Sequence, residues 1–104
     1  MRLALAVPVH RGVRYLPALF AALREQSRRP DEIWIAETEP SRETRELARA
    51  EGARYLEVEA ADYDHAGTRS LLARSVSAEL LVLLSQDARP LGADALARLV
   101  APLE

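Results

Sequence analysis

Apolar residues recur along the chain in two spacings, which predict strands and helices in alternation. Residues 3–7, 33–36 and 80–84 are short apolar runs, and residues 54–58 alternate between polar and apolar side chains. Each pattern is typical of a strand, and the uninterrupted run at 80–84 favours a strand covered on both faces. Pro8 follows the first run directly, which predicts that this strand stops there.

Helical stripes fill the intervals between these runs. An apolar spacing of i, i+3, i+4 and i+7 predicts a helix over residues 15–26, and Pro17 is tolerated in its first turn. Ser41 is a predicted cap of a helix that reaches Ala50, with Gly52 just past its end. A loop over residues 62–67 and a short helix over residues 68–77 are expected next. The stripe of the last helix consists of Leu96, Leu99, Val100 and Leu103.

The predicted elements alternate as strand and helix four times. Such alternation favours an α/β fold, an open parallel sheet of about four strands with helices on both faces. The chain has 104 residues, which predicts one domain over residues 1–104.

Composition excludes several classes of protein. The net charge is −2 with no long block of one sign, so nucleic acid is not an expected partner. The chain has no cysteine, which excludes disulfides and thiolate metal sites. The apolar run at the start is too short for a membrane span and lacks the features of a signal peptide, so a cytoplasmic protein is expected.

Polar segments follow each predicted strand, where ligands of open α/β sheets bind. These segments are residues 8–12, 37–39, 62–69 and 85–90. No GxGxxG opens the first helix and no GxxxxGK[ST] occurs, which argues against a dinucleotide fingerprint and a P-loop. Polar turns are common in every α/β domain, so position alone leaves the ligand open.

Four motifs together resemble those of family 2 glycosyltransferases. They are AVPVH at residues 6–10, IWIAE at 33–37, DHAGTRS at 64–70 and SQDARP at 85–90. The last two are similar to the bacterial rhamnosyltransferase-like branch of that family. The resemblance covers essentially the whole chain and implies the Rossmann-like, nucleotide-sugar-binding half of the glycosyltransferase A fold.

The resemblance assigns roles at the first two strand ends. Pro8, Val9 and His10 are expected to line the base and ribose of a UDP- or dTDP-sugar. Glu37 stands where the family usually has an aspartate that accepts a hydrogen bond from the base. A carboxylate suits the N3–H donor of uracil or thymine. The alternative for Glu37 is a solvated strand end.

The third segment carries the expected contacts to the diphosphate. Arg69 matches an arginine that lies near the diphosphate in the family, and an arginine at a helix start is favourable when an anion is bound there. Gly67 would allow the backbone to approach closely, and His65 would donate to a phosphate or hydroxyl. Ion pairing of Arg69 with Asp62 or Asp64 and ordinary turn-forming roles for the other two are the alternatives.

Asp87 matches the last carboxylate of the acidic motif of the family. The resemblance implies that Asp87, with Gln86 beside it, binds ribose or a Mg²⁺ or Mn²⁺ ion on the diphosphate. Only one carboxylate is present in this segment, so weak metal binding is expected without nucleotide. The alternative is an aspartate that fixes the turn before Pro90.

Length and departures from the motifs limit the functional prediction. Family members have a second half with the acceptor site and a catalytic base, so no catalytic residue is assigned and the chain is expected not to complete transfer alone. The strand at 80–84 would then lie at a sheet edge, which predicts a homodimer through it. Residues 39–42 replace a small, Gly-Ser-rich loop, which favours the alternative of a non-catalytic interaction or assembly module. An unrelated α/β domain for another small anion is a third reading.

Overall fold

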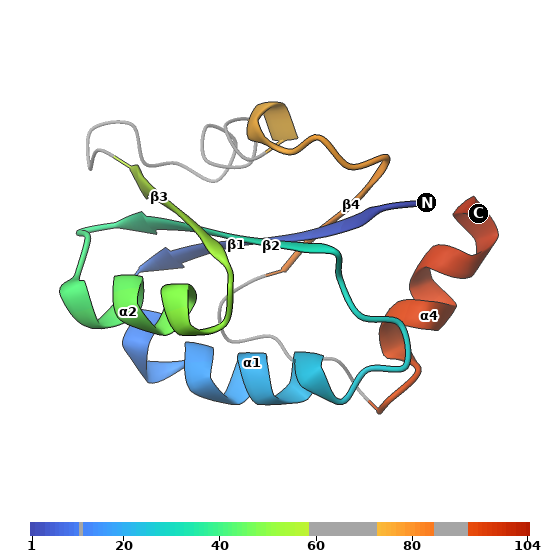
Figure 1. Ribbon diagram of the computed structural model, residues 1–104, viewed down its shortest axis with the longest axis horizontal. Coiled ribbons are helices and arrows are strands. Elements are labelled where there is room, and N and C mark those ends of the chain that lie inside the picture. Colours follow the sequence, from blue (N-terminus) through green and yellow to red (C-terminus); the bar gives the residue numbers. More distant parts are fainter. Residues whose placement is uncertain (11, 59–72, 85–91) are drawn as a thin grey trace.

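The computed structural model describes residues 1–10, 12–58, 73–84 and 92–104. Within them the chain forms one four-stranded parallel sheet in the order β3-β2-β1-β4 (Figure 1). The strands are β1 (Leu3–His10), β2 (Glu32–Thr38), β3 (Arg54–Val58) and β4 (Leu80–Leu83). The predicted α/β class with a parallel sheet of four strands is confirmed.

Helices connect the strands as the apolar stripes predict. They are η1 (Gly12–Arg14), α1 (Leu16–Arg24), α2 (Arg42–Ala50), α4 (Ala95–Val100) and η3 (Ala101–Leu103). Figure 1 shows α1 and α2 on one side of the sheet, and a short helical turn at residues 73–75 on the other. The expected loop at 62–67 and the start of the helix expected at 68–77 lie outside the described residues.

The core has a layer on each face of the sheet because strand side chains alternate. Odd-numbered residues of β1, such as Leu5 and Val7, pack with Leu19 and Phe20 of α1. Even-numbered Ala6 of β1 belongs to a second cluster with Trp34, Ala36 and Val58. This alternation decides toward which face each strand-end side chain points.

The strand ends and the last helix differ from the sequence-based boundaries. β1 continues through Pro8 to His10, so the prediction that the strand stops at Pro8 is wrong. The backbone of Ala6 bonds to Leu84 on the β4 side, and Pro8 faces the same side beyond the end of β4. Its missing N–H therefore costs no bond to β2.

The apolar stripe of the last helix is only half buried. Leu96 and Val100 are buried, whereas Leu99 and Leu103 are 56% and 65% exposed. The α-helix ends at Val100 and continues as the 3-10 turn η3, which changes the helical period. The predicted stripe is therefore correct for Leu96 and Val100 and wrong for Leu99 and Leu103.

Candidate functional site

The carboxyl ends of β1 and β2 meet at one edge of the sheet, where two of the predicted site segments converge. Val9 is level with Glu37 and His10 is level with Thr38 in the parallel register. β2 lies on one side of β1 and β4 on the other, so the strand order reverses at β1. In open α/β sheets such a reversal is where ligands bind.

His10 and Thr38 form a polar pair at this edge. The His10 Nδ1 atom lies 3.2 Å from Thr38 Oγ1, and His10 Nε2 lies 3.9 Å from a carboxylate oxygen of Glu39. The side chain of His10 is 42% exposed. Each ring nitrogen of histidine can donate or accept, depending on its tautomer, so His10 can offer a hydrogen bond to a polar ligand.

Glu37 lies at this edge of the sheet, and its carboxylate is engaged by other parts of the protein. It lies inside β2, its side chain is fully buried, and the alternative of a solvated strand end is therefore wrong. Its Oε2 accepts from the Gly12 N–H at 3.2 Å, and its Oε1 accepts from the Ser41 N–H at 3.0 Å. Oε1 also accepts from the Tyr55 hydroxyl at 2.5 Å. The carboxylate thus satisfies three donors of the protein itself.

The pKa of the Tyr55 hydroxyl is raised in this environment. Burial, and after it the hydrogen bond and negative charge of Glu37, raise the pKa of Tyr55 to about 12. The guanidinium of Arg45 lies 5.6 Å from the centre of the Tyr55 ring and acts in the opposite direction. Tyr55 is therefore a hydrogen-bond donor over the whole physiological pH range.

Close backbone approach brings the Gly12 N–H to Glu37. A Cβ at Gly12 would lie 3.1 Å from Cβ of Val9 and 3.2 Å from Cδ1 of Leu16, tighter than ordinary contacts. Glycine therefore lets η1 pack this close to β1 without displacing Val9 or Leu16. The packing presents the backbone amide to the carboxylate.

The turn after β2 combines strain with a helix cap. Glu39 has a φ of 52°, in the left-handed region that non-glycine residues rarely adopt. Two residues later, Ser41 caps α2 by accepting from the Thr44 N–H at 3.1 Å, as predicted. The left-handed residue turns the chain sharply from the sheet edge into α2.

The remaining predicted site residues lie outside the described part of the chain. These are His65, Gly67, Arg69, Gln86 and Asp87. Gln86 and Asp87 follow β4 in sequence, and β4 lies next to β1. Among the described residues, no group of three or more His, Cys, Asp or Glu side chains could hold a metal ion. The predicted Mg²⁺ or Mn²⁺ site depends on Asp87 and stays a prediction.

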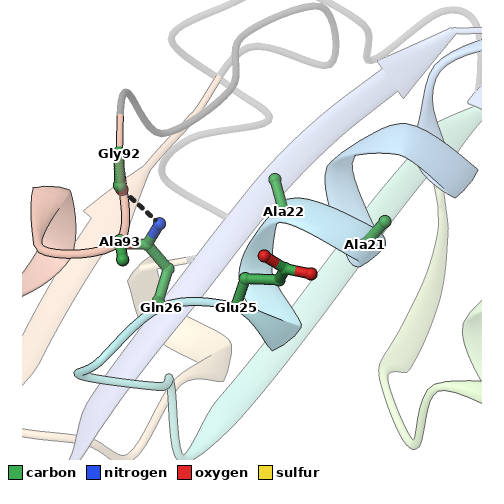
Figure 2. A pocket seen from close by; sticks show the side chains of 6 residues that line it. All are labelled: Ala21, Ala22, Glu25, Gln26, Gly92 and Ala93. Carbon is green, nitrogen blue, oxygen red and sulfur yellow. Dashed lines mark hydrogen bonds between the residues drawn. The ribbon is translucent and has the colours of Figure 1, made fainter.

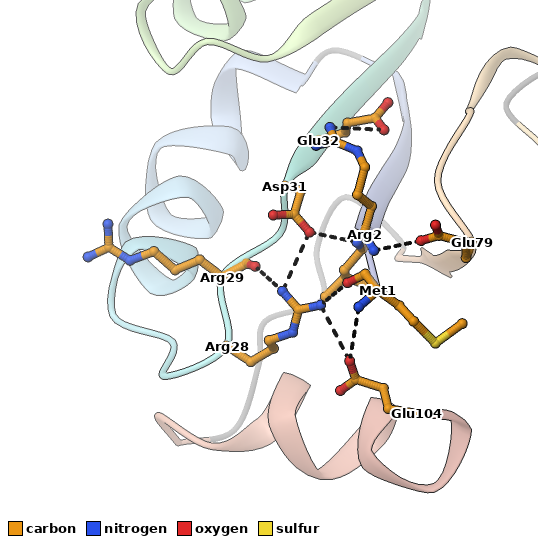
Figure 3. Close-up of polar contacts among 9 residues, drawn as sticks. Met1, Arg2, Arg28, Arg29, Asp31, Glu32, Glu79 and Glu104 are labelled. Atoms are coloured by element: carbon orange, nitrogen blue, oxygen red, sulfur yellow. Dashed lines mark hydrogen bonds and ion pairs between the residues drawn. The ribbon is translucent and has the colours of Figure 1, made fainter.

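Charged side chains gather at the opposite, amino-terminal edge of the sheet, where they are paired (Figure 3). Asp31 accepts from the Leu3 N–H at 2.7 Å, and Arg28 donates to the carbonyl of Met1 at 2.5 Å. Arg28 also pairs with Asp31 at 3.5 Å and with Glu104 at 3.7 Å. These contacts join the two ends of the described chain, so this cluster has a structural role.

A pocket of about 330 Å³ lies between the end of α1 and the residues before α4 (Figure 2). Its lining is Ala21, Ala22, Glu25, Gln26, Gly92 and Ala93. The Gln26 side chain donates to the Gly92 carbonyl at 2.8 Å and accepts from the Leu96 N–H at 3.1 Å. Its amide is thus engaged in joining the end of α1 to α4.

Sequence reasoning missed the partners of Glu37. Gly12, Ser41 and Tyr55 come from three separate segments, and only the tertiary fold brings them together. One signal was present in the sequence. Ile35 and Glu37 are two residues apart in one strand and therefore share a face, so a core-facing Ile35 predicts a core-facing Glu37.

No helix within residues 1–10, 12–58, 73–84 and 92–104 is long and apolar enough to cross a membrane. No protein-family model matches the chain.

The sequence is similar to that of a curated glycosyltransferase. The O-antigen chain rhamnosyltransferase RfbN of Salmonella typhimurium is 28% identical over 102 residues. The match covers 96% of this chain and 32% of RfbN. The chain therefore spans about a third of the length of this relative.

Solved structures share the fold at low sequence identity. S. aureus TarS matches with a TM-score of 0.74 and 16% identity, over 97% of this chain and 19% of TarS. TarS 1–349 in complex with UDP matches with a TM-score of 0.72 and 14% identity, over 97% and 31%.

A third structure is glucosyl-3-phosphoglycerate synthase from Mycobacterium tuberculosis, in complex with Mn²⁺, UDP and glucosyl-3-phosphoglycerate. It matches with a TM-score of 0.70 and 18% identity, over 98% of this chain and 39% of that one. The chain thus resembles glycosyltransferases in sequence and has the α/β fold of part of their length.

Proposed function

We propose that this chain is the nucleotide-diphospho-sugar-binding portion of a family 2 glycosyltransferase. The observation that carries the proposal is the meeting of residues 8–10 with residues 37–38 at the carboxyl ends of β1 and β2, next to the reversal of strand order. The fold is shared with a structure that contains UDP. UDP- or dTDP-sugars are the proposed donors, and no catalytic residue is assigned.

The proposed site has a base side and a diphosphate side. Pro8 and His10 line the base and ribose, Val9 contributes its backbone because its side chain is buried in the core with Leu5 and Val7, and Glu37 supports the same edge from inside the fold. His65, Gly67, Arg69, Gln86 and Asp87 form the diphosphate side. Asp87 is the proposed ligand of Mg²⁺ or Mn²⁺, and a structure with the same fold contains both Mn²⁺ and UDP.

Nucleotide-dependent stabilisation tests the proposal. UDP with Mn²⁺ is expected to raise the melting temperature, because a ligand that binds only the folded state stabilises it. At a ligand concentration about 100 times Kd, the gain is about 2.7 kcal/mol. Asp87→Ala and Arg69→Ala are expected to reduce the shift, since each removes a diphosphate contact.

Matched controls come from α2. Glu46→Ala and Arg42→Ala remove the same charges at exposed positions, where Arg42 and Glu46 pair with each other at 3.1 Å. Both are expected to keep the full nucleotide shift. If neither UDP nor dTDP changes the melting temperature of the folded wild-type chain at millimolar concentration, the proposed function is wrong.

A second candidate function is that of an assembly module that keeps the fold without using a nucleotide. One observation favours it. Within the described residues, no strand pairs with the outer edge of β4, which is apolar and half-buried. Such an edge can pair with a strand of another chain. A homodimer through β4 that does not respond to nucleotides would support this function.

A further inference from the structure

We propose that Glu37 is a positioning residue, whose buried carboxylate clasps three strand-end segments together and does not contact the nucleotide. The clasp consists of Glu37, Gly12, Ser41 and Tyr55, and we call it the Glu37 clasp. Its effect on ligand binding rests on the proposed function, whereas the clasp itself can be tested without a ligand.

The three donors of the Glu37 clasp come from three different segments. The Gly12 N–H lies at the start of η1, the Ser41 N–H at the start of α2, and the Tyr55 hydroxyl on β3. Their distances to the carboxylate oxygens are 3.2, 3.0 and 2.5 Å. A carboxylate has about four acceptor positions, so these donors occupy most of them.

Burial removes Glu37 from the reach of a ligand. Its side chain has no exposed surface. Burying a carboxylate is unfavourable unless hydrogen bonds replace those of water, and the three donors supply such bonds. A base could reach the carboxylate only by displacing a protein donor, which would leave that donor unpaired.

Strand alternation also separates Glu37 from the exposed polar groups of the edge. Ile35 packs in the cluster that contains α1, so Glu37, two residues on, points to the same face. Thr38 and its partner His10 occupy the alternate positions and point to the opposite face. A ligand that contacts His10 therefore lies on the other side of the sheet from the Glu37 carboxylate.

The Glu37 clasp nevertheless acts on that edge through the backbone. It joins the segment after His10, the segment after Thr38 and the neighbouring strand β3. Loosening it would let the ends of β1 and β2 shift relative to each other. The expected result is weaker binding of every nucleotide that uses this edge, without a change in preference among bases.

Ionisation of Tyr55 tests the clasp in the absence of ligand. All 14 basic residues are arginine, so between pH 10 and 12 the side chains that titrate are the three tyrosines. Tyrosinate absorbance should show a titration near pH 12 in the wild type that is absent in Tyr55→Phe. In Glu37→Gln that titration should move to lower pH, because the carboxylate that opposes phenolate formation is gone while the burial of Tyr55 remains.

Amide signals provide a second ligand-free readout at neutral pH. The amide protons of Gly12 and Ser41 should shift together in Glu37→Gln and stay near their wild-type positions in Glu46→Gln, an exposed control on α2. Tyr55→Phe keeps the hydrogen bonds from the Gly12 and Ser41 N–H groups to Glu37 and removes the third. It replaces Glu37→Gln as the test variant if Glu37→Gln does not fold. A Tyr55 titration near 10 in the wild type, or unmoved Gly12 and Ser41 amides in folded Glu37→Gln, would overturn the clasp.

Nucleotide affinity separates positioning from base contact. In each of the variants Glu37→Gln and Tyr55→Phe, the affinity for UDP and the affinity for CDP should fall by one common factor, roughly twofold to thirtyfold. The UDP-to-CDP preference should stay at its wild-type value in both variants. A loss confined to UDP in Glu37→Gln, with Tyr55→Phe unchanged, would show base contact and overturn the proposal. If the wild type binds no nucleotide, the proposed function fails, and the tyrosine and amide signals still decide on the clasp.

Discussion

Individual carboxylates in this chain accept hydrogen bonds from backbone amides at both ends of the strands. Asp31 accepts from the Leu3 N–H at 2.7 Å where the sheet begins, and Glu37 accepts from two N–H groups where β2 ends. In both cases a side chain supplies an acceptor to an amide that lies outside the regular ladder. Such bonds keep buried or edge amides satisfied.

Asp31 makes the stability of the fold depend on pH in the acidic range. Its hydrogen bond from Leu3, followed by the charge of Arg28, lowers the pKa of Asp31 below its usual 3.8. A lowered folded pKa means that the stabilisation is present above pH 3.8 and is lost as pH falls through the folded value. Asp31→Asn should therefore melt lower than the wild type near neutral pH, and the difference should shrink on acidification.

Melting curves at a series of pH values below neutral check this prediction, with Glu46→Gln as the control that removes an exposed carboxylate. A difference between Asp31→Asn and the wild type that grows as the pH falls would contradict it.

At the scale of elements, the turn between β2 and α2 carries backbone strain. Glu39 has a φ of 52° and precedes Pro40 and the capping residue Ser41. The left-handed region costs a non-glycine residue about 1–2 kcal/mol. Its carboxylate is exposed and lies 3.9 Å from His10, an arrangement worth little in water.

Glycine and valine at position 39 should have opposite effects on stability. Glu39→Gly is expected to be at least as stable as the wild type, because glycine adopts this φ without steric cost. Glu39→Val should be less stable by about 1–2 kcal/mol, because a β-branched residue is strained there. Urea denaturation of the two variants measures the difference. A Glu39→Val variant as stable as Glu39→Gly would show that the turn does not impose this conformation.

Elements were predictable from the sequence where local pattern decides them. Three apolar runs and one alternating segment identified the four strands of the described residues, and Ser41 was correctly identified as the cap of α2. Pro8 led to a wrong prediction of where β1 ends. The strand tolerates this proline because β4 ends beside it, and that arrangement exists only in the folded protein. Glu37 was located at the right sheet edge, but its burial depends on donors from three distant segments, which no local pattern contains.

At the scale of the whole molecule, the sheet ends at β4 within the described residues. The N–H groups of Leu80 and Leu84 donate to the carbonyls of Arg2 and Ala6 on the β1 side, so by alternation that of Leu81 points to the other side. The chain spans 32% of the curated relative and 19% of TarS. The outward N–H of Leu81 thus gives this edge a donor to which a further strand, from the same or another chain, can pair.

Self-association through β4 should depend on the outward N–H of Leu81. Leu81→Pro removes that donor without breaking the β1 ladder, and should abolish a dimer. Leu81→Ala loses the side-chain packing but keeps the N–H, so it should still dimerise. Sedimentation across a concentration series measures both. A wild type that remains monomeric at about 100 μM would contradict pairing at this edge.

The central claim is that a nucleoside diphosphate binds at the carboxyl ends of the strands. Mapping amide signals during a UDP titration tests this claim most directly. With Mn²⁺ replaced by diamagnetic Mg²⁺, the account predicts saturable shifts at Val9, His10, Thr38 and the residues that follow β4. It predicts little change at Arg28 and Asp31 on the opposite edge, whose charges are already paired. Shifts confined to the Arg28 edge, or none on a folded chain at millimolar UDP, would contradict it.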